Sequence, residues 1–170
     1  CKIMQTNNFA SNKAADASLD RILSVTGMAK NFVLYSCSNI DNCVATAYNG
    51  VRYILYDKDF MDEIASNTTS WSNLSILAHE IGHHVNGHSL DLILYAAGAD
   101  APTLEKSRQH ELEADEYSGF VMYKLGASLE QAQAAVNLFG SEGDDTYSTH
   151  PNKIKRLAAV EKGYKNALSI

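Results

Sequence analysis

The sequence predicts a single α+β domain over residues 1–170, mainly helical, with a small antiparallel sheet of about three strands near its N-terminal side. β-rich runs are confined to residues 31–56, whereas stretches with the helical spacing of apolar residues dominate the remainder. The length, with 45% hydrophobic and 20% charged residues, suits one self-sufficient core. We expect the helix that carries a His-Glu-x-x-His motif to lie beneath the sheet.

The N-terminal third is predicted to form one helix followed by the sheet. Residues 13–25 place apolar side chains at helical spacing, and Gly27 follows where a helix end favours a left-handed residue. The expected strands are residues 31–36, 44–48 and 51–56. Asn49-Gly50 separates the last two strands, and this dipeptide is a strong signal for a two-residue hairpin turn.

Helical patterns continue from there to the C-terminus. The expected helices are residues 57–65, 72–95, 103–125, 128–139 and 151–162. Leu74, Leu77, Ile81 and Val85 form an apolar stripe that should face the core. Ser128 and Gln131 have capping-box spacing, and Pro151 suits the first turn of the last helix. The segment 140–149 is polar and predicted to be flexible.

Charge and hydropathy exclude two classes of partner. The net charge is −6 and the pI is near 5.4, with only 14 scattered Lys and Arg, whereas nucleic acids and anionic membranes select basic patches. No apolar run approaches the roughly 20 residues needed to span a bilayer. We therefore expect no nucleic-acid partner and no membrane-spanning segment.

The cysteines leave two questions of compartment open. A bacterial lipoprotein matures to an N-terminal cysteine that carries the lipid, so Cys1 suggests a lipid-anchored periplasmic or cell-envelope protein. The alternative is a soluble cytoplasmic protein for which Cys1 has no such meaning. Cys37 and Cys43 flank a turn-prone stretch that could join them in a disulfide, which would indicate an oxidising compartment. Two ordinary thiols are the alternative.

Residues 79–83 have the sequence His-Glu-Ile-Gly-His within an apolar run that is compatible with a helix. Helical residues four apart return to nearly the same face, so His79 and His83 can converge on one tetrahedral Zn²⁺ per chain. Glu80 then lies beside them, where it can act on water rather than on the metal. The motif predicts a zinc hydrolase, although roughly one chain in fifty of this length would carry it by chance.

A catalytic zinc needs three protein ligands and an open position for water. His88 lies about 140° from His83 on a continuous helix, so we expect it to support the site rather than bind metal. Glu111 and Asp115 are four apart on a later helix and share a face, while Glu113 points nearly opposite. One of the two carboxylates can bind zinc while the other accepts a hydrogen bond from the outer nitrogen of a ligand histidine.

At these residues the chain resembles the gluzincin zinc metallopeptidases that include the HtpX-like heat-shock proteases, the CAAX prenyl endopeptidases and the BepA-like periplasmic proteases. The resemblance spans about Asn42 to Ala159 and rests on residues 79–83 with His88, 111–115 with Gly119, and 148–151 with Arg156-Leu157. It implies a zincin-like fold, Glu111 as third ligand and Asp115 as a partner that supports the ligands. It also implies His150 and Arg156 near the substrate side of the zinc. The short spacing from His83 to Glu111 leaves no room for the hydrophobic hairpins of the membrane-embedded members, which argues against a prenyl-peptide substrate.

Together these residues predict a zinc-dependent endopeptidase for unfolded or extended proteins, as in protein quality control. Glu80 would be the general base for a metal-activated water, and His150 would stabilise the oxyanion. An extended peptide could add to the sheet edge. The expected edge residues are Val44, Ala45, Thr46 and Ala47. A zinc-stabilised latent or chaperone-like binding module and a non-peptide zinc hydrolase are the alternatives.

Overall fold

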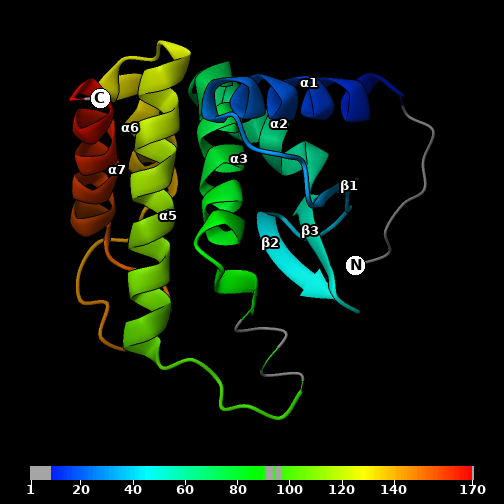
Figure 1. Ribbon diagram of the computed structural model, residues 1–170. Helices are drawn as coiled ribbons and strands as arrows, with labels where there is room; N and C mark the ends of the chain where they lie inside the picture. The colour runs from blue at the N-terminus through cyan, green and yellow to red at the C-terminus, as the bar shows by residue number, and fades with distance from the viewer. Residues whose placement is uncertain (1–8, 91–93, 95–96, 170) are drawn as a thin grey trace.

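The computed structural model describes residues 9–90, 94 and 97–169. Their elements are α1 (Phe9–Thr26), β1 (Val33–Ser36), β2 (Cys43–Tyr48), β3 (Val51–Tyr56), α2 (Lys58–Asn67), α3 (Ser70–Val85), α5 (Leu104–Leu125), α6 (Leu129–Phe139) and α7 (Lys153–Leu168). Figure 1 shows α3 between the small sheet on one side and α5 and α7 on the other. The predicted α+β class is confirmed, and the motif helix packs against the sheet as expected.

The described residues form one three-stranded sheet in the order β1-β3-β2. β2 and β3 are antiparallel, and both turn residues between them have positive φ, 48° at Asn49 and 75° at Gly50, as the hairpin signal predicts. β1 pairs with β3 in parallel, so the prediction of a wholly antiparallel sheet is wrong. The alternating pattern of a strand reports which face is buried and carries no information on strand direction.

Helix α3 ends at Val85, so the prediction of one helix to residue 95 is wrong. Gly87 has a φ of 74°, which a helix interior does not allow, and the Asn86 side chain donates to the carbonyl of Gly82 over 2.8 Å. Residues 88–90 are helical again after this turn. The predicted stripe is buried at Leu74, Leu77 and Ile81, whereas Val85 is exposed at the helix end.

The C-terminal helices begin and end largely where local signals place them. Thr103 caps α5, and Gly126 ends it with a φ of 94°. Both hydrogen bonds of the predicted capping box open α6. Helix α7 begins after Asn152, whose side chain accepts from the amide of Lys155. Pro151 therefore precedes the cap instead of occupying the first turn, and it is buried.

Two glycines let α5 and α7 pack with their backbones in contact. A Cβ added to Gly119 would lie 1.9 Å from the carbonyl oxygen of Val160. A Cβ added to Gly163 would lie 1.7 Å from the carbonyl oxygen of Glu116. Neither atom can be accommodated, so these positions require glycine while the helices stay this close. This contact holds the middle of α7 beside the second half of α5.

Neither alternative for Cys37 and Cys43 holds. Cys43 is a free, buried thiol, so the two residues are not joined in a disulfide. Cys37 does form a disulfide, but not with Cys43. The amide of Cys37 donates to Tyr56, and Cys43 pairs with Tyr56 from the opposite side of β3. Two strand spacings of about 4.8 Å exceed the Cα separation that a disulfide spans.

The expectation of a lipid at Cys1 concerns a residue outside the described ones. Among the helices of residues 9–90, 94 and 97–169, none is both long and apolar enough to span a bilayer.

Candidate metal and catalytic site

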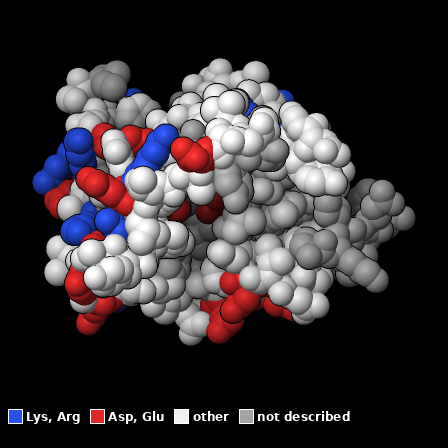
Figure 2. Space-filling model, turned by 90° about the horizontal axis from the view of Figure 1, so that it is seen from below, with Lys and Arg blue, Asp and Glu red and all other residues white. Residues whose placement is uncertain are grey.

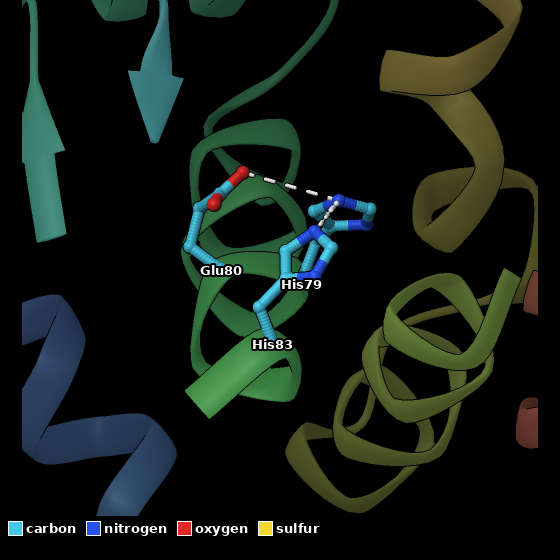
Figure 3. Close-up of side chains that lie close together, drawn as sticks. All are labelled: His79, Glu80 and His83. Atoms are coloured by element: carbon cyan, nitrogen blue, oxygen red, sulfur yellow. Dashed lines mark hydrogen bonds and ion pairs between the residues drawn. The ribbon is translucent and has the colours of Figure 1, made fainter. Parts of the chain in front are cut away.

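Helix α3 brings three side chains of the predicted motif together. His79, Glu80 and His83 offer ligand atoms that all lie within 4.8 Å of one another. The two Nε2 atoms of His79 and His83 are 3.1 Å apart. Figure 3 shows both imidazoles on one face of α3, with the Glu80 carboxylate beside them. The helical spacing of four residues therefore produces the convergence that the sequence predicts.

Glu111 on α5 completes a set of three metal-binding groups. Its Oε2 lies 3.0 Å from Nε2 of His79, and its Oε1 lies 3.2 Å from Nε2 of His83. The nearest Glu80 oxygen is 3.9 Å from Nε2 of His79, so the carboxylate of Glu111 lies closer to the two histidines than that of Glu80 does. Two nitrogens bound to one tetrahedral zinc are roughly 3.3 Å apart. Two imidazoles and one carboxylate at these separations fit a catalytic zinc with one open position.

The Nδ1 side of the His79 ring contacts a buried ion pair between Asp115 and Arg156. Its Nδ1 lies 2.8 Å from Oδ1 of Asp115, which is the support that the sequence predicts for a ligand histidine. Arg156 donates to both Asp115 oxygens, over 2.8 Å from Nε and 3.0 Å from Nη2. Asp115 and Arg156 are both buried. Arg156 therefore acts on His79 through Asp115, and it also lines the cavity beside the site.

This environment fixes the charge of His79. Burial disfavours a charged imidazole, but Asp115 and Glu111 outweigh burial and raise the pKa of His79 to about 10. Burial also opposes the charge of Glu111, yet the two histidines hold its pKa well below its usual range. The site therefore stays negatively charged on its carboxylates and accepts a cation, either a proton or a metal ion.

His83 contacts His88, the residue that the sequence predicts to support the site, and Glu113 extends this chain, which sequence reasoning missed. Its Nδ1 lies 2.9 Å from Nδ1 of His88, and Nε2 of His88 lies 2.7 Å from Oε2 of Glu113. When His83 offers the lone pair of Nε2 to a metal, its Nδ1–H donates to His88, whose own Nε2–H donates to Glu113. The turn at Gly87 brings His88 back to His83, and Asn86-Gly87 is the sequence signal for it.

Glu80 is buried and touches the edge of the sheet. Its Oε2 accepts from the amide of Ala45 on β2 over 2.6 Å. β2 is an edge strand, so the edge that carries Ala45 faces the site. Burial, opposed by the neighbouring charge on His79, raises the pKa of Glu80 to about 7. A carboxylate with this pKa can accept a proton and release it near neutral pH.

His150 lies at the rim of the site, in the segment between α6 and α7. Its Nε2 is 3.9 Å from Oε1 of Glu111, and its side chain is 59% exposed. The amide of His150 donates to Oγ of Ser148, and its Nδ1 lies 3.0 Å from Oγ1 of Thr149. These contacts leave Nε2 turned towards the proposed ligands.

A cavity of about 580 Å³ opens onto these side chains. One part of its wall is polar and includes His79, His83, Glu111 and His150. Another part is apolar and comes from Ile76, Ala132, Ala135, Val136 and Phe139. Of the predicted edge residues, Val44 and Ala45 line the cavity. Figure 2 shows a hollow near the centre of this face, with acidic side chains inside it.

Comparison with known proteins supports a metallopeptidase. The model of peptidase family M48 matches residues 89–163, a little under half of the chain. The matched segment contains Glu111, Asp115, His150 and Arg156, whereas residues 79–83 precede it. The motif and the match are therefore separate observations that lead to the same site. No curated protein and no solved structure matches the chain significantly.

Proposed function

We propose that this protein is a zinc-dependent endopeptidase that hydrolyses peptide bonds in unfolded or extended protein substrates. The observation that carries the proposal is the convergence of His79, His83 and Glu111, with Glu80 beside them, on the wall of one cavity. The partial match to peptidase family M48 supports the same class of reaction.

His79, His83 and Glu111 would hold the metal. Zinc bound there supplies Lewis-acid chemistry, because it polarises the scissile carbonyl and lowers the pKa of a water towards about 7. Asp115 fixes the ring orientation of His79, and His88 fixes that of His83. Both rings are thereby set with Nε2 towards Glu111, so little ordering remains when a metal binds.

Glu80 would be the general base. Its Oε2 accepts a hydrogen bond from the amide of Ala45. Its Oε1 faces the proposed metal ligands and lies 3.9 Å from Nε2 of His79. Oε1 would take the proton of the attacking water and deliver it to the leaving amine. The buried position raises the pKa of Glu80 to about 7, which suits a group that both accepts and returns a proton.

The substrate would bind in extended form along β2. Edge strands offer backbone groups to an added strand, and the proposed segment is Val44, Ala45, Thr46 and Ala47, in which the amide of Ala45 already donates to Glu80. Val44 and Ala45 line the cavity, so a peptide added there would pass beside Glu80. His150 would donate from Nε2 to the developing oxyanion, a kind of contact whose loss costs about 10² to 10³ in kcat.

The test combines metal analysis with digestion of an unfolded protein. Wild type should hold one zinc per chain and generate new peptide termini, and excess chelator should stop the reaction. Glu80→Gln should keep zinc and fold but lose hydrolysis, because a carboxamide cannot accept the water proton. Glu63→Gln, an exposed change on α2, should behave as wild type. Full turnover by Glu80→Gln would refute the assigned mechanism.

A further inference from the structure

The segment between α6 and α7 is irregular, yet one side chain of α5 gathers its backbone. Nη1 of Arg108 lies 3.1 Å from the carbonyl oxygen of Asp145 and 2.9 Å from those of Thr146 and Ser148. Three carbonyls converge on one guanidinium nitrogen because the chain curls around it. The sequence predicts flexibility here, whereas the structure holds this part of the segment against α5.

The contact leads directly to His150. The carbonyl of Ser148 accepts a hydrogen bond from Arg108. The Oγ of Ser148 accepts another from the amide of His150 over 3.0 Å. A chain of contacts therefore runs from Arg108 through Ser148 to the residue that faces the site. If Arg108 were lost, the carbonyls of residues 145, 146 and 148 would lose their shared donor. The backbone that sets the direction of His150 would then keep the bond from the amide of Ser148 to the carbonyl of Asp145 but lose its hydrogen bonds to Arg108, and it should move more.

A second anchor uses the side chain of Asp145, whose backbone carbonyl accepts from Arg108. The side chain of Asp145 accepts from the amide of Asn152 over 2.8 Å and from Nζ of Lys155 over 3.0 Å. These contacts tie the segment to the start of α7 and do not involve Ser148. Asp145 therefore keeps the segment attached to the fold, while Arg108 sets the path of residues 145–148 towards His150.

Helix α5 makes Arg108 suitable for this task. Arg108 precedes Glu111 by three residues, so the two side chains lie on neighbouring positions of one helix face. One rigid helix thereby sets the distance between a proposed metal ligand and the backbone that carries His150. All three carbonyls meet Nη1, which carries two N–H groups, so the contact is concentrated at one point of the guanidinium. A lysine ammonium also offers its donors at one point and should therefore reproduce part of the contact.

We infer that Arg108 is a positioning residue for His150, which it holds with Nε2 directed at the substrate oxygen. This inference rests on the proposed function. Loss of Arg108 should lower kcat because His150 leaves its place, with little change in KM. Zinc affinity should stay unchanged, because the hydrogen bonds of Arg108 go to backbone carbonyls of the segment and not to His79, His83 or Glu111.

A double-mutant cycle of Arg108→Ala and His150→Ala tests the inference, with kcat measured on an unfolded protein. Arg108→Ala should reduce kcat about tenfold or more in wild type but less than about twofold in the His150→Ala background. Arg108→Lys should recover part of the loss. The same fold reduction in both backgrounds would overturn the inference, because Arg108 would then act without His150. Absence of hydrolysis by wild type would instead overturn the proposed function.

Amide hydrogen exchange supplies a readout that does not depend on turnover. In Arg108→Ala, exchange of residues 145–150 should rise while zinc affinity, measured by competition with a chelator, stays as in wild type. Unchanged exchange would refute the anchoring role. Lys153→Ala is the matched control, because it removes a cation that contacts Glu142 in the same segment. A loss of kcat in Lys153→Ala equal to that in Arg108→Ala would show a general charge effect and overturn the inference.

Discussion

Zinc binding to the metal-free protein should release a proton, because His79 must give up the one that it holds. His79 lies between Oδ1 of Asp115 at 2.8 Å and Oε2 of Glu111 at 3.0 Å. Burial opposes protonation, but these two carboxylates raise the pKa of His79 from 6.5 to about 10. At neutral pH the metal therefore competes with a bound proton for Nε2.

The size of the effect follows from the shift. A pH of 7 is about three units below the pKa of His79. Removing the proton of His79 at this pH therefore costs about 4 kcal/mol and weakens the apparent zinc affinity roughly a thousandfold. Each unit of pH between about 7 and 9 should raise that affinity about tenfold. Because the folded pKa exceeds the unfolded one, the same group stabilises the metal-free protein fully below about pH 6.5. This stabilisation should be lost as the pH rises towards 10.

Calorimetric titration with zinc in two buffers of different ionisation enthalpy measures how many protons are released for each zinc ion bound, here called the proton number. At pH 8 we expect a value close to one, and a plot of log affinity against pH with a slope close to one. A proton number near zero in both buffers would refute the reasoning. Such a value would mean that His79 is neutral in the metal-free protein and that the two carboxylates do not act on it as described.

Three further predictions concern separate parts of the site. Glu113→Gln should weaken zinc binding about tenfold through His88, measured by chelator competition, and unchanged affinity would rule out that chain. Gly163→Ala should lower the melting temperature, since its Cβ would meet the carbonyl of Glu116 at 1.7 Å; an unaltered transition would contradict the helix contact. The acid limb of kcat/KM should lie below about pH 7, because burial raises the pKa of Glu80 to about 7 and a bound cation lowers it. A limb above pH 7 would argue against Glu80 as the base.

Features encoded by neighbouring residues could be predicted from the sequence. Asn49-Gly50 specifies its hairpin turn because both residues tolerate positive φ, and Ser128 with Gln131 specifies the start of α6. The pairing of His79 with His83 is also local, since helical periodicity alone places them on one face. For the proposed third ligand, the chemistry of zinc left Glu111 and Asp115 as alternatives, and the resemblance to gluzincins favoured Glu111.

Features that depend on distant packing could not be predicted in the same way. β1 pairs in parallel with β3 and lies across β3 from β2, and no local pattern encodes which strand β1 joins or in which direction. Arg156 is turned to Asp115 because Gly119 and Gly163 bring α7 against α5, and no local pattern encodes that approach. The role of Glu113 was missed for a simpler reason, because one helix was assumed to continue through Asn86-Gly87.

The central claim is that His79, His83 and Glu111 hold one zinc ion. Its most direct test is a crystal of the zinc-loaded protein, with diffraction measured on both sides of the zinc absorption edge. We predict one anomalous peak about 2.0 to 2.2 Å from Nε2 of His79, Nε2 of His83 and a carboxylate oxygen of Glu111. A peak bound elsewhere, or one that Glu80 ligates in place of Glu111, would contradict the claim.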